Sequence, residues 1–134
     1  MRLRLAAVIA SSATALAVGV AAPAADAGQR THVVAHCSSV DYKPARYVFF
    51  CADAGAGLNG ATYTDWTKTD AHGAGTYYRN DCRPSCAGGT VHQHSATFHL
   101  YRVVQTKKHG PLFTRIKVSW GTRDKVYGLP TSPI

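Results

Sequence analysis

The clearest pattern of apolar and polar positions lies between residues 91 and 104. Successive side chains of an extended chain point to opposite faces, so a period of two separates them. One face of this run carries the apolar residues Ala96, Phe98, Leu100 and Val104. The other face carries Gln93, Ser95, Thr97 and His99. The pattern predicts a long strand with one face in the core and the other in water.

A second run with the same period follows a turn at residues 107–111. Its core-facing positions are expected to be Leu112, Thr114, Ile116, Val118 and Trp120. Its water-facing positions are expected to be Phe113, Arg115, Lys117 and Ser119. Because a short turn joins the two runs, we expect them to pair as a long antiparallel hairpin.

The rest of the chain contains shorter sequence patterns that favour strands and turns. Residues 46–51 are aromatic and β-branched and follow Pro44, which favours a strand. Glycines predict a turn over residues 54–60 and a break in the chain at residues 73–75. About six or seven short strands in one domain indicate an all-β fold, a small antiparallel β-sandwich or a flattened barrel. Residues 121–134 are expected to be a partly loose C-terminal tail.

The first 27 residues have the pattern of a signal peptide. Arg2 and Arg4 precede an apolar stretch over residues 5–20, and Ala25-Asp26-Ala27 then offers small residues two apart. The stretch is shorter than the ~20 residues that a bilayer-spanning helix needs. We therefore expect export, with residues 28–120 as the secreted β domain and no transmembrane segment in the mature chain.

All four cysteines, Cys37, Cys51, Cys82 and Cys86, lie in this mature part. An even number in an oxidising exterior predicts two disulfides, for which three pairings are possible. We favour the sequential pairing because each bond then closes a local loop. On the chain-entropy relation, the two loops would contribute about 3 and about 2 kcal/mol of stability. Zinc is disfavoured, because a Cys-x-x-x-Cys pair with one distant Cys is a poor spacing for it.

The mature chain is strongly basic. Without Arg2, Arg4 and Asp26, the 15 basic and 7 acidic residues become 13 and 6, a net charge of +7. Seven of these cations lie in the C-terminal third: Arg102, Lys107, Lys108, Arg115, Lys117, Arg123 and Lys125. A basic face favours binding to anionic polymers or simply keeps the domain in solution. The chain contains no glutamate, which removes several familiar hydrolytic mechanisms.

Several motifs follow one another along the mature chain. They are Pro44, Phe50-Cys51-Ala52-Asp53, Trp66, Gly73-x-Gly75, Asn80-Asp81-Cys82-x-Pro84-x-Cys86-Ala87-x-Gly89 and Phe113-Thr114-Arg115. In these motifs the chain resembles a group of small exported proteins common in actinobacteria, over roughly residues 37–120. It departs from them at residues 54–57, where a Gly-Asn turn is usual. The group has no established activity, so the resemblance implies fold and export and carries over no catalytic residue.

His92 and His94 are the most suggestive chemical pair. Residues two apart on a strand share a face at about 6.5 Å, near enough to hold one metal ion. A third ligand would come from His36, His99 or an aspartate. The same two histidines, acting with His72 and Arg115, would alternatively suit a small hydrolase. A third interpretation is that the two histidines are only polar rings at the solvated end of a strand.

Two further features suggest binding. A Cys82–Cys86 disulfide would present Arg83-Pro84-Ser85 on a rigid loop, as a protease inhibitor does, or would only staple a tight turn. Aromatic residues would line a stacking surface or fill the core; they are Tyr63, Trp66, Tyr77, Tyr78 and Tyr101. Trp120 is expected to be structural.

The observations together favour a secreted, monomeric, non-catalytic domain that binds an anionic envelope polymer or a secreted protein and needs no cofactor. Nucleic acid is not expected as a specific partner. The candidate binding residues are Arg83, Pro84, Arg102, Lys107, Lys108, Arg115 and Lys117. The alternatives are a small hydrolase or metal-binding enzyme using His92 and His94, and an inhibitor-like protein presenting the Cys82–Cys86 loop. An enzyme predicts a histidine and an aspartate in one concave pocket, whereas a binding module predicts a broad basic or aromatic face.

Overall fold

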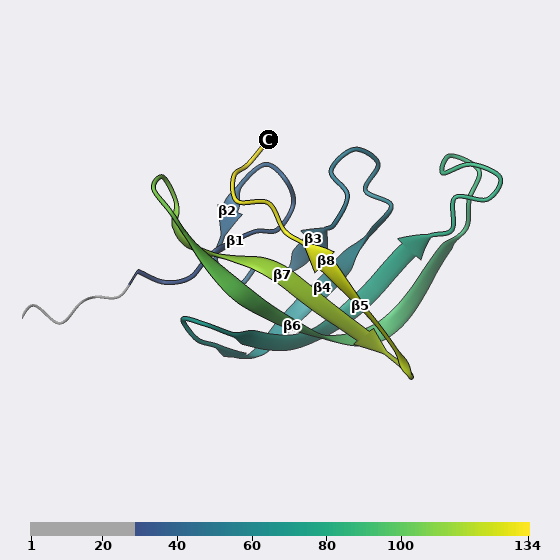
Figure 1. The fold of residues 1–134 in the computed structure, drawn as a ribbon. Coiled ribbons are helices and arrows are strands. Elements are labelled where there is room, and N and C mark those ends of the chain that lie inside the picture. The colour runs from purple at the N-terminus through teal and green to yellow at the C-terminus, as the bar shows by residue number, and fades with distance from the viewer. Residues whose placement is uncertain (1–28) are drawn as a thin grey trace, which may run out of the picture.

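Most of the chain after residue 46 forms one antiparallel sheet in which each strand pairs with the next (Figure 1). Its strands are β3 (Arg46–Val48), β4 (Ala56–Trp66), β5 (Ala71–Asn80), β6 (Val91–Thr106), β7 (Gly110–Trp120) and β8 (Arg123–Gly128). A small second sheet pairs β1 (Val33–Val34) with β2 (Val40–Asp41). The computed structural model describes residues 29–134, so the predicted signal peptide lies outside the described part.

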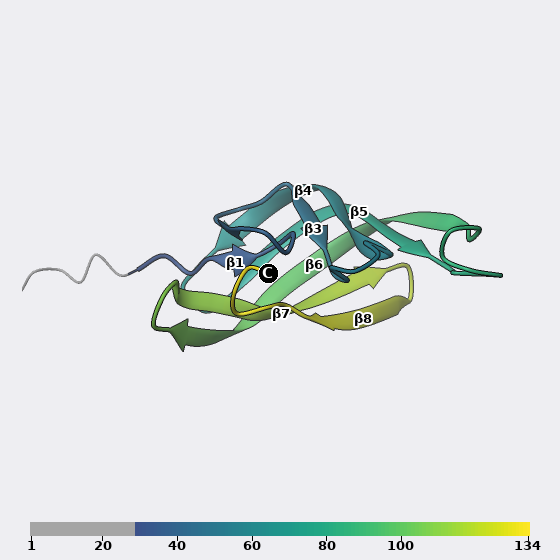
Figure 2. The ribbon, with the colours of Figure 1, turned by 90° about the horizontal axis from the view of Figure 1, so that it is seen from above.

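The large sheet curls into a half-barrel. Figure 2 shows β3 and β4 on one side and β7 and β8 on the other, with β6 between them. The all-β prediction is confirmed, and the curled sheet matches its flattened-barrel form. Among residues 29–134 there is no helix of the length and apolarity that a membrane crossing requires.

Residues 31–35 help to close one end of the curl. The His32 N–H donates to the Pro111 carbonyl at 3.0 Å, and the His32 carbonyl accepts the Phe113 N–H at 3.0 Å. On the other side, the Val48 N–H donates to the Ala35 carbonyl at 2.8 Å. The segment therefore bridges the first half of β7 to β3. The second half of β7 pairs with β8 instead.

The curl stays open between β8 and the strands β3 and β4. Among the described residues, no backbone hydrogen bond joins β8 to β3 or β4. Side chains alone close this seam, where the Phe49 and Tyr127 rings stack with centroids 4.2 Å apart. The hollow of the half-barrel holds the core, which includes Leu58, Leu100 and Ile116.

Both disulfides have the sequential pairing that we favoured. Cys37 bonds to Cys51 and Cys82 bonds to Cys86, and the described residues contain no free cysteine. The first bond ties the segment after β1 to the end of β3. The second closes a loop between β5 and β6. Two disulfides are compatible with an extracellular protein.

The predicted hairpin is confirmed as β6–β7, but its alternation changes part-way. Arg102 has a left-handed backbone, with φ of 57°. Beyond it Val103 packs against the core, whereas Val104 is 40% exposed. Phe113, the partner of Val103, is fully buried rather than facing water. The expected positions of Val104 and Phe113 were therefore wrong, because one left-handed residue rotates the end of the strand.

Most of the glycines expected to form a turn or a break lie inside strands. Gly57 belongs to β4, and Gly73 and Gly75 belong to β5. A Cβ at Gly73 would collide with the Thr62 carbonyl and the Phe98 ring. These glycines allow neighbouring backbone and aromatic groups to approach closely. The predicted break at residues 73–75 was wrong, and the turn predicted over residues 54–60 was wrong from Ala56 onward, where β4 begins.

The segment expected to be a partly loose tail contains strand β8. Gly121, with φ of 54°, lies in the tight turn that returns the chain from β7. Tyr127 and Leu129 are buried in the core. The inward positions before them are the cations Arg123 and Lys125, so an apolar period of two never appears in the sequence.

Candidate functional site

Towards the open end of the half-barrel, the inward-facing side chains of the strands change from apolar to polar. On β6, Ala96 and Phe98 are buried, and the next inward positions are the exposed His94 and His92. Because side chains alternate along a strand, all four point to the same face of the sheet. The apolar core thus ends at Ala96 and polar side chains continue the concave face.

The inward-facing side chains of the neighbouring strands change in the same way at the positions beside His94 and His92. Directly paired residues of antiparallel strands share a face. Tyr77 pairs with His94, and Arg79 pairs with His92. Across the sheet, Trp120 pairs with Arg123. Aromatic and then basic side chains therefore follow the core on two strand pairs, β5–β6 and β7–β8.

These side chains line two neighbouring hollows, which we together call the basic groove. One part, of about 290 Å³, is lined by Tyr77, Arg79, His92, His94, Trp120 and Arg123. The adjoining part, of about 400 Å³, is lined by Arg79, Asn80, Asp81, Arg83 and His92. The two parts share Arg79 and His92. Together the two linings contain three arginines and one carboxylate, that of Asp81.

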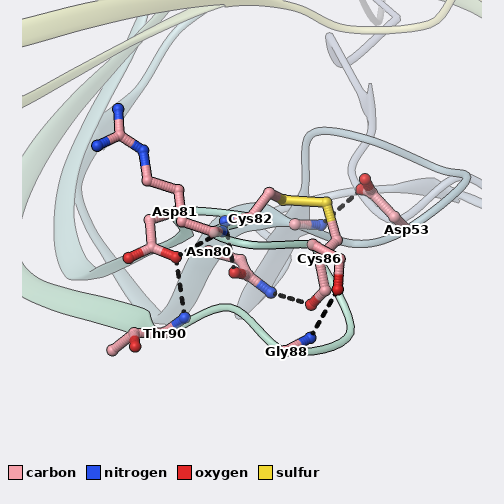
Figure 3. The surroundings of a disulfide bond; sticks show 10 residues. Asp53, Asn80, Asp81, Cys82, Cys86, Gly88 and Thr90 are labelled. Atoms are coloured by element: carbon pink, nitrogen blue, oxygen red, sulfur yellow. Dashed lines mark hydrogen bonds between the residues drawn. A yellow bond between two sulfur atoms is a disulfide. The ribbon is translucent and has the colours of Figure 1, made fainter.

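The loop that carries Arg83 is held by its own hydrogen bonds (Figure 3). Asn80 Oδ1 accepts the Cys82 N–H at 2.9 Å, and Asn80 Nδ2 donates to the Cys86 carbonyl at 2.7 Å. Ser85 Oγ accepts the Gly88 N–H at 3.2 Å. With the disulfide, these bonds fix the loop at the rim of the basic groove and leave the Asn80 amide occupied.

Asp81 links this loop to His92. Its Oδ1 accepts the N–H groups of Thr90 at 2.9 Å and Arg83 at 3.1 Å, and its Oδ2 lies 3.1 Å from His92 Nε2. The Thr90 N–H, then the His92 ring and the Arg83 N–H, lower the pKa of Asp81 to about 2. The carboxylate is therefore ionised and only accepts hydrogen bonds. His92 Nε2 carries the proton that it donates, and Nδ1 is directed elsewhere.

A stack of rings forms the inner end of the basic groove. The Trp120 ring lies 4.6 Å from the Tyr77 ring and 6.1 Å from the His94 ring, measured between centroids. The Tyr77 hydroxyl is hydrogen-bonded to the Tyr127 hydroxyl. Trp120, expected to be structural, packs against the core and also lines the groove.

The structure separates most of the basic residues that the sequence suggested for binding. Arg83 lines the basic groove, and Pro84 is exposed in the same loop. The other candidates lie elsewhere on the hairpin β6–β7: Arg102, Lys107, Lys108, Arg115 and Lys117. Figure 1 shows the tip of that hairpin at the opposite end of the sheet from the loop after β5.

Two of these cations are also engaged locally. The Arg115 guanidinium donates to the Thr114 carbonyl at 2.9 Å. Lys117 forms a 2.7 Å ion pair with Asp124. Sequence reasoning missed Arg79 and Arg123 as site residues. Both arginines lie on the inward faces of strands that were not predicted. The glycines of β5 were interpreted as a break in the chain, and the residues of β8 were interpreted as part of a loose tail.

The predicted metal pair lies in the basic groove, where the nearby Asp81 carboxylate is bonded to the His92 ring and to the N–H groups of Thr90 and Arg83. His92 and His94 both line it. His99 lies on the opposite face of β6, and His36 lies beside Asp41, 3.7 Å away. Between residues 29 and 134, no group of three or more His, Cys, Asp or Glu side chains is placed to hold a metal ion.

Two other aspartate–histidine pairs occupy the outer face of the sheet. His72 Nδ1 lies 3.0 Å from Asp65, and His99 Nε2 lies 2.7 Å from Asp70. The two imidazole rings stack at 4.3 Å. The hydrogen bond from His99 is the largest cause of a lowered pKa of Asp70. These pairs resemble Asp81–His92 in geometry, but no arginine lines the hollow beside them.

Of the two alternatives for the aromatic residues, the structure favours packing in the core over a common stacking surface. Tyr77 is buried in the core, and Tyr63 packs against it. Tyr78 and Tyr101 belong to the outward-facing rows of β5 and β6. The Trp66 indole N–H donates to the Thr31 carbonyl at 2.9 Å.

Comparisons of this chain with protein-family models, curated proteins and solved structures find no match.

Proposed function

We propose that this chain is an exported, monomeric domain that binds an anionic polymer of the cell envelope in the basic groove. The observation that carries the proposal is the convergence of Arg79, Arg83 and Arg123 at the open end of the half-barrel. The one carboxylate among them, Asp81, already accepts two backbone N–H groups and the His92 ring. The arginines thus keep their charge available for a ligand.

Phosphate is the anionic group that suits this lining. Arginine presents a planar fork of N–H donors that matches phosphate oxygens two at a time. Cations from β5, β8 and the loop after β5 surround the basic groove on different sides, which suits a phosphodiester with two free oxygens. The disulfide and the Asn80 hydrogen bonds hold the loop before a ligand arrives, so less ordering entropy is lost on binding.

A polymer is favoured over a small ligand by the shape and position of the basic groove. Its two parts adjoin through Arg79 and His92 and open at the edge of the sheet. A chain with repeated phosphates can occupy both parts at once. Outside a cell that exports such a domain, phosphodiester-linked polyols of the wall are abundant polymers of this chemistry.

Trp120 provides the signal for a direct test. In a Trp66→Phe background, Trp120 is the remaining tryptophan and lines the basic groove. We would titrate this protein with purified poly(glycerol phosphate) at low salt and follow the fluorescence. The expected result is saturable binding that weakens as salt is raised, because exposed charges are screened.

Paired variants separate a specific groove from general charge. Arg79→Gln with Arg123→Gln removes two charges from the basic groove, and Lys107→Gln with Lys108→Gln removes two from the far hairpin tip. Hydrogen bonds to charged groups are worth roughly 1.5–3 kcal/mol, so the first pair should weaken binding at least about tenfold. The second pair should change it little. Equal losses would show that only net charge matters and would overturn the proposal.

A further inference from the structure

The Asp81–His92 pair has the arrangement of a positioned base. Asp81 is fixed by two backbone N–H groups of the stapled loop, and it holds the His92 ring through Nε2 at 3.1 Å. The carboxylate orients the ring and selects the tautomer whose Nδ1 can accept a proton. His92 is half exposed and lines both parts of the basic groove. An oriented imidazole therefore faces the space where a ligand phosphate would lie.

A second imidazole lies beside it in a different setting. His94 is two residues away on the same face of β6, about 6.5 Å along the strand. Its ring lies against Trp120 rather than on a carboxylate. Two histidines separated in this way can serve the two sides of one phosphate, one accepting a proton and the other donating one.

The residues that line the basic groove offer no obvious nucleophile of their own. They include no Ser, Thr or Cys side chain, and the Tyr77 hydroxyl is engaged with Tyr127. A ligand that carries a hydroxyl next to its phosphodiester brings the nucleophile with it. Covalent attachment already holds such a hydroxyl close to phosphorus.

We propose that the basic groove also cleaves the phosphodiester that it binds, with His92 as general base, His94 as general acid and the neighbouring hydroxyl of the ligand as nucleophile. This inference rests on the proposed function, because it needs the same ligand in the same groove. The substrate class is a polyol phosphate with a free hydroxyl beside each phosphodiester. Asp81 acts as a positioning residue.

The step needs no other reactant. His92 Nδ1 takes the proton of the hydroxyl while its oxygen forms a new bond to phosphorus. The bond from phosphorus to the next unit breaks, and protonated His94 gives its proton to the departing oxygen. The products are a cyclic phosphodiester end and a free hydroxyl end, and proton exchange with water resets both histidines. Arg79 and Arg123 stabilise the charge on the phosphoryl oxygens.

The lining favours a polyol over a ribonucleotide. An amide side chain can read a base edge, but both ends of the Asn80 amide in this lining are bonded within the loop. The Tyr77 and Trp120 rings pack against each other in a tilted arrangement. The groove therefore offers cations and imidazoles for phosphates and hydroxyls, and no unoccupied group of this kind for a base edge.

The test uses two substrates that differ in their leaving group. The first is poly(glycerol phosphate), whose leaving alkoxide needs a proton. The second is 2-hydroxypropyl 4-nitrophenyl phosphate, whose nitrophenolate leaves without one. Ethyl 4-nitrophenyl phosphate, which lacks the hydroxyl, is the substrate control. The protein should cleave the first two and leave the third intact.

The variants assign the roles. His92→Ala should slow both substrates by about 100-fold or more, the usual effect of losing acid–base catalysis. His94→Ala should slow the polymer to a similar extent and the nitrophenyl ester only slightly. His99→Ala, which removes an aspartate-bonded histidine from the outer face of the same strand, should change neither rate. Rates in His92→Ala that stay close to those of the unaltered protein would overturn the assignment.

Binding read from Trp120 keeps the two proposals distinguishable. If poly(glycerol phosphate) binds but neither it nor the hydroxypropyl ester is cleaved, the catalytic inference fails and the binding function stands. If the polymer neither binds nor reacts, both fail. Cleavage of a ribonucleotide dimer in place of the polymer would overturn the assigned substrate class.

Discussion

Removing the Cys37–Cys51 disulfide tests how the half-barrel is closed. Residues 31–35 bridge β7 to β3, and Val33, Val34 and Ala35 are fully or almost fully buried. The disulfide joins the chain just after this segment to the turn that follows β3, across a sequence separation of 14. For a loop of that length, the chain-entropy relation gives about 3 kcal/mol of stabilisation. The double variant Cys37→Ala, Cys51→Ala should lose about that amount.

The second disulfide provides an internal comparison. Cys82 and Cys86 are four residues apart, which corresponds to about 2 kcal/mol on the same relation. Residues 81–90 contribute no side chain to the core. Cys82→Ala with Cys86→Ala should therefore cost at most that amount, and it should weaken ligand binding because Arg83 loses its fixed position.

Urea denaturation followed by circular dichroism measures both losses. A destabilisation of about 3 kcal/mol in a domain of this size lowers the melting temperature by roughly 12–24 °C. The reasoning would be refuted if the Cys37–Cys51 variant lost less than about 1 kcal/mol. It would also be refuted if the Cys82–Cys86 variant proved the less stable of the two.

Three further predictions follow from single positions. Leu100→Ala, at a fully buried core site, should cost about 3 kcal/mol in thermal denaturation, and a cost below about 1 kcal/mol would contradict the assigned core. Gly73→Ala should destabilise the domain strongly because its Cβ meets the neighbouring strand, whereas Gly88→Ala meets only ordinary contacts and should be close to neutral in the same assay. The Asp81 carboxyl should titrate near pH 2 in carbon NMR; a midpoint near 4 would contradict its bonding. Because this pKa is lowered on folding, its stabilising contribution is present above about pH 4 and lost as the pH falls towards 2.

The sequence predicted those parts of the fold in which one local rule decides the structure. A period of two between residues 91 and 104 was enough to predict strand β6, and the hairpin turn then determined its partner. Sequential disulfides followed from loop length. The glycines of β5 defeated the same reasoning, because their role depends on the Phe98 ring and the Thr62 carbonyl, which approach only in the folded sheet.

The candidate site was predicted only in part for a similar reason. His92, His94 and Arg83 were singled out from the sequence, and all three line the basic groove. Arg79 and Arg123 were missed because of the strands on which they lie. The inward-facing positions of these strands carry too few apolar residues to produce an alternating pattern in the sequence. The C-terminal lysines were given too much weight as binding residues, because cations that are close together in the sequence lie at both ends of a long hairpin.

Mapping the ligand onto the backbone amides by NMR tests the central claim most directly. On addition of poly(glycerol phosphate), the account predicts the largest shifts in residues 77–83, 92–94 and 120–123, with little change at the hairpin tip, residues 106–110. Shifts centred on the hairpin tip, or spread evenly over the outer face of the sheet, would contradict an anion-binding groove at the open end of the half-barrel.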